Sequence, residues 1–593
     1  MPPTSFRHLL PPRIFILAGL TLTTGCGDSV STVPPQKSDV VSTEPASNRD
    51  QVISEEMRKH LWDIEHLGFV LEATVFPKLK ATLNDGSLDY WSQLLSDECV
   101  CVIPSVSPGS TEGATVVAGG MARFQSTVRE PTQQVATNKP GFLQWLEAVR
   151  KQFTQCSTSM GLVRLVPQDE ADSQFWTTVW RLRIAGLSDQ GPIEAEFDIE
   201  LSLGELNDDI AAQSSWGTTV SVASQQRMTA QQHFFTEITE ASGLLRPERH
   251  DNWTAGNFVA NTGGVYVSDY DQDGNLDVFV DDHADGNRLY RGLGDGTFEE
   301  TTEAAGIDSG GAARAWALSC WADLDNDGDD DLIVEDRLYE NLGDGKFADV
   351  TSETNLPLTP ATSYAVADYD LDGLLDLYVC HAGAYRVGQQ KKTRVKWIDD
   401  GLGIDNVLLK NCGGWQFEDV TRATNTGAGG SSCFTAIWLH ANNDNRPDLF
   451  AINEFGVNAL LLNSADGPFE STDVDAVFGG FSMGAAAGDY NNDGHTDIYV
   501  ANMYSKAGNR ILANVDQSRY PADLYRKIVE GTRGSKLYSW HSEATYEVVP
   551  EREMFANVGW AYGPTFTDLD NDGWLDLYAT AGFKSEERGK PDG

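Results

Sequence analysis

Nine residues, Asp269 to Asp277, carry the most specific chemistry in this sequence. Their order is DYDQDGNLD, which places carboxylates at the first, third, fifth and ninth positions and glycine at the sixth. The same DxDxDGxxD pattern occurs three more times, and a fifth copy has Asn491 in place of the carboxylate at the third position. The further copies span residues 323–331, 368–376, 489–497 and 568–576. Repetition in one register indicates a protein built from repeated units.

Oxygen side chains at alternate positions can wrap a short loop around one hard cation, and glycine supplies the backbone conformation that the turn needs. Calcium accepts about six to eight oxygen ligands in loose geometry, whereas magnesium requires an octahedron and keeps its waters. We therefore expect Ca²⁺ in all five loops. The expected ligands are Asp269, Asp271, Asp273, Asp277, Asp323, Asp325, Asp327, Asp331, Asp368, Asp370, Asp372, Asp376, Asp489, Asn491, Asp493, Asp497, Asp568, Asp570, Asp572 and Asp576.

The loops differ from EF-hands, which need a glutamate at the twelfth position and a helix on each side. The twelfth residues here are Val280, Val334, Val379, Val500 and Ala579. Residues after the ninth acid, such as VFVD after Asp277, have strand composition, so each loop should join two strands. The alternative is that these acids merely cluster in solvated turns. Five copies disfavour it, because like charges about 5 Å apart repel by about 3 kcal/mol at an effective dielectric constant near ~20.

A second motif follows each loop and predicts a hairpin. Residues 287–302 (NRLYRGLGDGTFEETT), 337–351 and 406–421 share it, and residues 458–472 match more loosely. Asp followed by Gly tolerates the positive φ of tight hairpin turns. One unit therefore holds about four short strands, the size of a propeller blade. A degenerate copy of the loop at residues 440–448 (HANNDNRPD) makes six units, and we expect no metal in it.

Loop, hairpin and the FxDVT strand recur in this order over roughly residues 233–593. In this they resemble the FG-GAP or VCBS repeats of integrin α-chain propellers and of bacterial relatives of cartilage acidic protein. The resemblance implies a mainly β fold, a β-propeller of about six or seven blades with calcium loops, used for adhesion or ligand binding. The segment 235–239 (FTEIT) copies a unit's last strand and is expected to complete the final blade. Only 17 residues follow Asp576, so either that blade is incomplete or the sequence is truncated.

The N-terminus has the features of an export signal. Arg7 and Arg13 precede a short apolar run, residues 14–22, and Cys26 ends a stretch that resembles a lipoprotein cleavage box. Thr23 stands where that box usually has leucine, so plain secretion and an uncleaved anchor remain alternatives. We predict a signal peptide at 1–26, a flexible tether at 27–50 and a cell-surface or periplasmic location, with a lipid on Cys26.

A smaller α+β domain is predicted at residues 51–230, before the propeller. Residues 54–83 have helical periodicity interrupted at Pro77, a second helix is expected at 141–153, and four strand-like runs follow. The strand-like runs are 162–166, 175–184, 193–203 and 218–223. The pattern resembles the cone-shaped nuclear-transport-factor-2-like fold, and it contains no catalytic set that we recognise.

Composition limits the classes of partner. The 593 residues carry a net charge of −45, which argues against nucleic acid and anionic membrane surfaces. Apart from Cys26, seven cysteines remain without zinc-type spacing, so at least one is unpaired within the chain. An exported protein could contain one or two disulfides, and the sequence does not decide this.

Two long insertions follow the strands that leave the calcium loops, so we expect both at the opposite face of the propeller. They are residues 381–403, which include the basic stretch Lys391, Lys392, Arg394 and Lys396, and residues 502–534, which include Tyr504, Tyr520 and Tyr525. Long loops on a rigid scaffold often carry binding sites. We expect a non-enzymatic protein that binds a protein or polysaccharide ligand there; solvated loops without a ligand are the alternative.

The alternative function is an extracellular polysaccharide hydrolase or lyase built on the propeller. The sequence GFSMG at 480–484 matches the GxSxG pattern around a catalytic serine. That motif requires a strand before the serine and a helix after it. Ser482 instead falls in the column that Ala561 holds in GWAYG, a blade strand, so we predict no catalysis there.

Overall fold

The chain forms two compact units, one of which covers Phe235–Ser505 and Arg526–Glu586 and holds the repeats. Among the residues that the structure describes, the protein is mainly β, with 45% strand and 17% helix. The computed structural model describes residues 55–110, 114–116, 122–127, 133–169, 172–206, 209–233, 235–245, 264–281, 286–308, 319–334, 337–356, 361–381, 404–428, 431–442, 444–465, 467–472, 479–550 and 555–581. The predicted signal peptide, lipid site and tether lie outside these residues.

The N-terminal unit begins with a helix that changes its hydrogen-bonding pattern once. α1 (Glu55–Val70) continues through a π-helical turn (Leu71–Val75) into α2 (Phe76–Asn84). Pro77 is the second residue of α2 and directly follows the π-helical turn, at a point where proline cannot donate the hydrogen bond of a regular helix. Ile64, Leu71 and Val75 are fully buried, which confirms the predicted apolar side of this helix.

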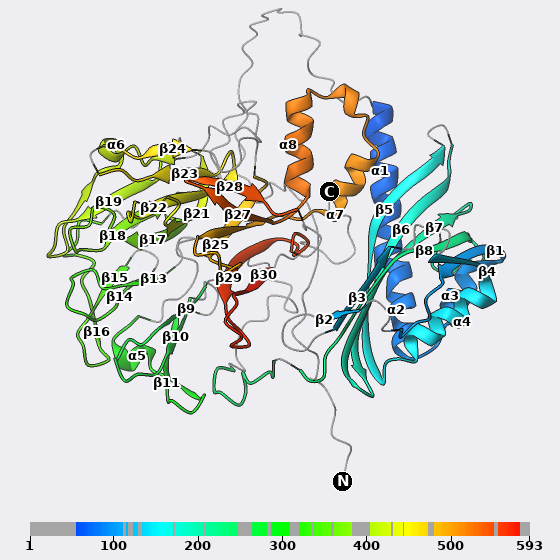
Figure 1. Ribbon diagram of the computed structural model, residues 1–593, viewed down its shortest axis with the longest axis horizontal. Coiled ribbons are helices and arrows are strands. Elements are labelled where there is room, and N and C mark those ends of the chain that lie inside the picture. Colours follow the sequence, from blue (N-terminus) through cyan, green and yellow to red (C-terminus); the bar gives the residue numbers. More distant parts are fainter. Residues whose placement is uncertain are drawn as a thin grey trace, which may run out of the picture. The chain divides into compact units, whose positions relative to one another are not determined.

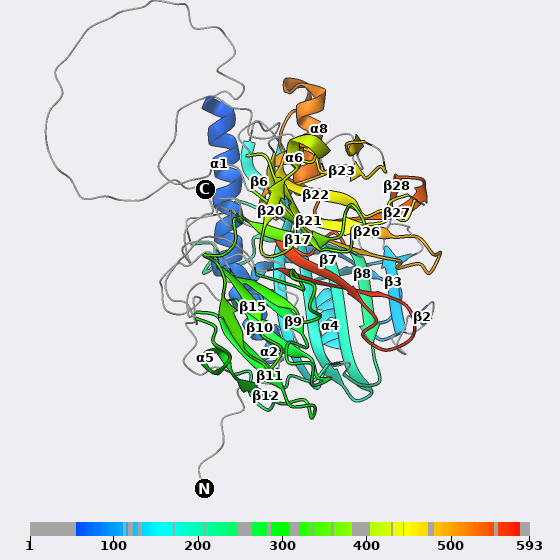
Figure 2. The same cartoon turned by 90° about the vertical axis from the view of Figure 1, so that its left-hand side faces the viewer.

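Eight strands form the sheet of this unit, and its four longest strands were the ones predicted (Figure 2). Its hydrogen-bonded order is β2-β3-β8-β7-β6-β5, with β1 paired to β4 and β8. The strands are β1 (Leu95–Pro104), β2 (Thr115–Val116), β3 (Ala122–Thr127), β4 (Gln134–Asn138), β5 (Gln155–Asp169), β6 (Asp172–Ser188), β7 (Gly191–Leu203) and β8 (Gly217–Thr229), and the further helices are α3 (Asp89–Leu94) and α4 (Lys139–Arg150). Sequence reasoning missed α3 and β1 to β4.

Lys506–Tyr525 belongs to the same compact unit as the N-terminal domain. It contains α7 (Lys506–Ala513) and a 3₁₀ turn (Gln517–Arg519). Asn514 Nδ2 donates to the backbone oxygen of Leu165 in β5 at 2.9 Å. The insertion at 502–534 was expected as a loop on the propeller. This part of it is instead largely helical and packs in the other unit.

The repeat unit contains five four-stranded antiparallel sheets in succession (Figure 1). This confirms about four strands for each of the first five units. The strands are β9 (Val265–Ser268), β10 (Asp277–Val280), β11 (Arg288–Gly292) and β12 (Phe298–Glu300); β13 (Cys320–Ala322), β14 (Asp331–Val334), β15 (Arg337–Asn341) and β16 (Phe347–Asp349); β17 (Ser363–Ala367), β18 (Asp376–Cys380), β19 (Val407–Asn411) and β20 (Phe417–Asp419); β21 (Ser432–Leu439), β22 (Asp448–Phe455), β23 (Ala459–Leu462) and β24 (Glu470–Thr472); and β25 (Ser482–Gly488), β26 (Asp497–Asn502), β27 (Lys536–Ser542) and β28 (Thr545–Val548). Helices α5 (Thr302–Ala305) and α6 (Thr421–Thr424) follow β12 and β20, and α8 (Ala522–Thr532) precedes β27.

A sixth sheet has two strands within the described residues, β29 (Ala561–Thr567) and β30 (Asp576–Ala581). The segment 235–239 was expected to complete this sheet, but it lies in no strand. The turn that follows instead contacts the first sheet, because Phe298 N donates to the Ser242 oxygen at 2.8 Å. Gly243 lies in this turn with φ 83°, and a Cβ there would lie 2.8 Å from the Phe298 oxygen. Gly306, after β12, meets Phe347 of the second sheet in the same way.

Asparagines at the ends of third strands join consecutive sheets. Asn341 Nδ2 donates to the Tyr270 oxygen at 2.9 Å, Asn411 Nδ2 to the Leu324 oxygen at 2.7 Å, and Asn463 Nδ2 to the Tyr369 oxygen at 2.7 Å. In the fifth sheet, Trp540 Nε1 takes this role with the Ala441 oxygen at 3.1 Å. Each acceptor is the second residue of the preceding unit's acidic loop. The loops therefore lie at the same end of consecutive sheets.

Candidate metal centres

Each acidic loop connects the first and second strands of its sheet, as predicted. The second strands β10, β14, β18, β26 and β30 all begin at the ninth residue of a loop, and β22 begins at Asp448 of the degenerate copy. No EF-hand helix follows any of these loops. The local sequence thus places the acids at a tight connection between two antiparallel strands.

The first acid of each loop accepts the backbone N–H of the glycine at the sixth position. The Oδ2–N distances lie between 2.8 and 3.0 Å in all five loops. The glycines have φ values from 87° to 99°, which confirms their predicted role. The fourth residue also has positive φ, as at Gln272 and Leu371, and the sequence pattern did not reveal this second turn. The acid at the fifth position accepts the N–H of the residue at the seventh position. For example, Asp372 Oδ1 accepts Leu374 N at 3.0 Å.

The acid at the ninth position of each loop has a structural role in addition to any role as a ligand. Asp331 is 1% exposed, and its two oxygens accept the N–H groups of Leu324 and Asn341, each at 2.9 Å. Asp277, Asp376 and Asp448 make the equivalent pair of bonds. Burial raises the pKa of Asp277 to about 6 and the pKa values of Asp331 and Asp376 to about 7.

Four of the five loops bring three carboxylates together, with one oxygen of each lying within 4.8 Å of the others. The groups are Asp269, Asp271 and Asp273; Asp323, Asp325 and Asp331; Asp368, Asp370 and Asp376; and Asp568, Asp570 and Asp572. The other predicted ligands lie in the same loops but outside these groups: Asp277, Asp327, Asp372, Asp576, and all four residues of the loop at 489–497. In that loop, Asn491 Nδ2 donates to Ser539 Oγ at 3.3 Å.

The donors fit a hard cation. All are oxygens, and the buried atoms Asp269 Oδ1 and Asp370 Oδ1 have no hydrogen-bond partner. A buried carboxylate oxygen without a donor is costly unless a cation or another donor satisfies it. Calcium matches this set better than zinc, which prefers nitrogen and sulfur. These residues could therefore hold Ca²⁺, which would neutralise the loops and link their acids.

Residues on the third strands also border the loops, and sequence reasoning missed them. Lys410 Nζ lies 2.7 Å from Asp372 Oδ2 and also contacts Asp370 Oδ2. Arg291 Nη1 lies 3.6 Å from Asp271 Oδ2 and 3.9 Å from Asp273 Oδ2. Both side chains come from the residue before the end of the third strand. The recurring strings RLYRG and VLLKN could have revealed this position.

At the other end of the second strands, buried polar residues bond the start of the third strand. His381 N donates to Asn406 Oδ1 at 2.9 Å, and Asn453 N donates to Asn458 Oδ1 at 2.8 Å. The recurrent Asn that precedes the third strand in NVLL and NALL was the sequence feature that marks this contact. The His381–Asn406 bond fixes the strand ends between which the first insertion lies. Residues 382–403, with the basic stretch, lie outside the described part of the chain.

Ser482 of the GxSxG pattern lies at the start of β25 and is fully buried. Its Oγ donates to Asn502 Oδ1 at 2.6 Å and accepts from Asn458 Nδ2 at 3.0 Å. Ser482 pairs with Asn502 as Ala561 pairs with Ala581 in the last sheet. The prediction of an ordinary sheet strand is therefore confirmed, and the strand-to-helix turn of a nucleophile is not found at Ser482.

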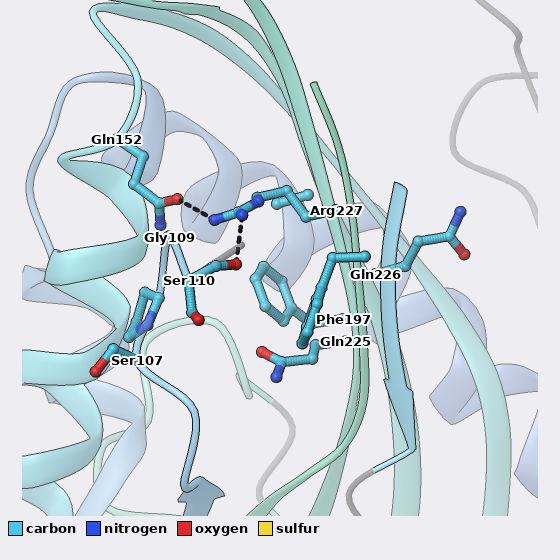
Figure 3. A pocket seen from close by; sticks show the side chains of 11 residues that line it. Ser107, Gly109, Ser110, Gln152, Phe197, Gln225, Gln226 and Arg227 are labelled. Carbon is cyan, nitrogen blue, oxygen red and sulfur yellow. Dashed lines mark hydrogen bonds between the residues drawn. The ribbon is translucent and has the colours of Figure 1, made fainter. Parts of the chain in front are cut away.

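The N-terminal unit contains a small recess beside β7 and β8 (Figure 3). Arg227 points into it, where Nη2 donates to the Ser110 oxygen at 2.5 Å and Nη1 to Gln152 Oε1 at 3.4 Å. Burial lowers the pKa of Arg227. The described residues that line the recess include no carboxylate, histidine or cysteine, so they offer no general acid–base pair.

Comparison with solved structures gives only low similarity. The V. cholerae biofilm matrix protein Bap1 is 15% identical over 41% of this chain and 35% of its own, with a TM-score of 0.25. The NanB sialidase of Streptococcus pneumoniae is 9% identical over 73% of this chain and 90% of its own, with a TM-score of 0.23. The BvnE pinacolase of Penicillium brevicompactum is 15% identical over 26% and 85%, with a TM-score of 0.16. Functions do not transfer at such scores.

No curated protein matches the chain. Among the described residues, no helix combines the length and the apolar composition needed to cross a bilayer. A family model described as the FG-GAP-like repeat matches residues 256–334, 335–379 and 441–500. These segments include four of the five acidic loops and all but the first residue of the degenerate one. At these three places, the chain consists of FG-GAP-like repeats.

Proposed function

We propose that the repeat unit is a calcium-stabilised β-propeller that binds a protein or polysaccharide partner outside the cytoplasm, without catalysis. The observation that carries the proposal is the set of acid clusters at the same end of consecutive sheets. Calcium would neutralise their mutual repulsion and so hold each first strand to its second. A rigid scaffold of this kind suits the presentation of a recognition surface.

Packing between sheets supports the propeller. The first strands β9, β13, β17, β21, β25 and β29 contact one another in this order. The second strands β14, β18 and β26 are buried throughout, whereas β10 is buried at alternate residues and β30 has no buried residue. Val265, Val267 and Tyr578 are 68%, 53% and 51% exposed at the two ends of the series. Closure of a ring would cover these apolar side chains.

The FG-GAP-like repeats and the predicted export signal support a location outside the cytoplasm. Extracellular calcium sites are typically weak, with dissociation constants of about 10⁻⁴ to 10⁻³ M, because external calcium is abundant. Loops that are partly exposed and lined only by oxygen fit that range. A lipid on Cys26 would keep the protein at the surface of the membrane.

Calorimetry of the full chain with CaCl₂ tests the calcium role. We expect heat on titration and a lower melting temperature in EGTA than in calcium. Absence of both effects would refute the proposal. A glycan array and affinity capture from surface extracts, each with and without calcium, then test the partner. Ligand capture that requires calcium supports the proposed role, whereas turnover of a glycan without stable capture contradicts it.

A further inference from the structure

One position on the third strand faces each acidic loop, and its identity differs from sheet to sheet. The acid at the ninth loop position accepts the N–H of a third-strand residue. Gly292 N donates to Asp277 at 2.7 Å, and Asn411 N donates to Asp376 at 2.8 Å. The residue immediately before this donor is the facing position. In the five four-stranded sheets, the facing residues are Arg291, Glu340, Lys410, Leu462 and Ser539.

Lys410 supplies a positive charge inside the third loop. Its Nζ contacts Asp370 Oδ2 and lies 2.7 Å from Asp372 Oδ2, and its side chain is 26% exposed. The two carboxylates raise the pKa of Lys410, and the ammonium lowers the pKa of Asp372. A calcium ion that used these oxygens would have to displace the ammonium group, which is tethered at the site.

Arg291 makes a longer and more exposed version of the same contact. Its nearest oxygen is at 3.6 Å, and its side chain is 38% exposed. Exposed ion pairs at such distances contribute little free energy. Arg291 should therefore compete with calcium less strongly than Lys410.

Glu340 reverses the charge at this position in the second loop. It is half-buried, and its charge acts on Asp325 together with the neighbouring Asp327. Asp329 at the seventh position adds a further carboxylate to the same loop. The second loop therefore has the highest negative charge of the five complete loops, and negative charge close to the ligands attracts a cation.

We infer that the facing residue grades the calcium sites: Glu340 makes the second loop the tightest, and Lys410 neutralises the third loop so that it binds calcium weakly. This inference rests on the calcium role proposed above. Lys410 would then neutralise part of the negative charge of the loops. The loops would bind calcium in a defined order as the calcium concentration rises.

Calorimetric titration with CaCl₂ on the full chain at fixed ionic strength tests the order. Lys410→Met should raise the affinity of one site at least about tenfold, and Glu340→Lys should lower the affinity of one tight site by about as much. Lys151→Met is the matched control, because it removes one charge from an exposed pair with Glu147 in the N-terminal unit. It should leave every calcium site unchanged.

Thermal melting supplies a second readout. In EGTA, Lys410→Met should melt below the wild type, because Asp370 and Asp372 lose their counter-ion, and calcium should remove the difference. If the wild type binds calcium but both loop variants match it in affinity and melting, the inference is wrong and the calcium role stands. If the wild type binds no calcium, the proposed function itself fails. If Glu340→Lys does not fold, Glu340→Gln replaces it, because glutamine is close to glutamate in shape. Glu340→Gln should lower the calcium affinity of one tight site.

Discussion

Asn411 in the third sheet holds the acidic loop of the second sheet, since its Nδ2 donates to the backbone oxygen of Leu324 at 2.7 Å. The same nitrogen donates to the Leu375 oxygen of its own loop at 3.1 Å, and Oδ1 accepts Gly413 N at 2.9 Å. Asn411 is 1% exposed. One buried amide thus connects two candidate metal loops and a hairpin, independently of any cation.

Replacement of this amide should destabilise the repeat unit. Asn411→Ala leaves two buried carbonyls and one N–H without a partner, so we expect a loss of about 2–3 kcal/mol in unfolding free energy. Urea denaturation in calcium, followed by circular dichroism, measures it. Gln416→Ala, an exposed neighbour, is the control and should cost less than about 0.5 kcal/mol. Equal midpoints for the two variants would contradict a linking role for Asn411.

Replacing the acid at the fifth position by asparagine should affect stability differently from the same replacement at the ninth position of one loop. Asp331→Asn places an amide NH₂ against one of two backbone N–H donors, so it should destabilise by about 2–3 kcal/mol with or without calcium. Asp327→Asn keeps the oxygen that accepts Asp329 N at 3.0 Å, so in EGTA it should be as stable as the wild type. Its deficit should be in calcium affinity, measured by calorimetry. Identical behaviour of the two variants would exclude this division of roles.

The loops could be predicted because each depends on residues within nine positions of one another. The acids, the sixth-position glycines and the strands that begin at the ninth acid all follow from local spacing and turn chemistry. The bonds between sheets could not be predicted in this way. Asn341, Asn411 and Asn463 reach acceptors 71 to 94 residues away, and no local periodicity encodes such a pairing.

The missed elements have similar physical causes. The third and fourth strands of the fifth sheet, KLYSWHS and TYEV, lack the Gly-Asp-Gly turn that marked the other hairpins. The π-helical turn at Leu71–Val75 leaves the apolar spacing of an ordinary helix almost unchanged. Lys506–Tyr525 packs in the N-terminal unit. This packing depends on contacts between residues far apart in the sequence, which the spacing of the loops does not reveal.

Ser482 should be structural. Ser482→Ala removes an Oγ that bonds both Asn458 and Asn502, so we expect a loss of about 1–2 kcal/mol in unfolding free energy. The wild type should not react with a fluorophosphonate probe, because the hydroxyl is buried and lacks a base. Labelling of the wild type that the Ser482→Ala variant abolishes would establish a nucleophile and overturn the prediction.

Glu454 in β22 should make stability depend on pH near neutrality. Burial raises its pKa to about 7 from an ordinary value of 4.5, so the folded protein binds a proton here that the unfolded chain has released. Its contribution is complete below pH 4.5 and is lost as pH rises through about 7. Each unit of pKa shift corresponds to about 1.4 kcal/mol, so we expect a decrease of about 1–3 kcal/mol.

Glu454→Gln should abolish this dependence, because the amide is neutral at every pH. Its unfolding free energy relative to the wild type should therefore rise between pH 5 and pH 7.5, measured by urea denaturation at fixed calcium. Glu470→Gln, on the exposed edge strand β24, is the control and should show a difference that is constant with pH. The comparison isolates Glu454 from the titrating acids of the loops, which all three proteins share. A Glu454→Gln difference that is constant across this range would mean that Glu454 is ionised in the folded protein.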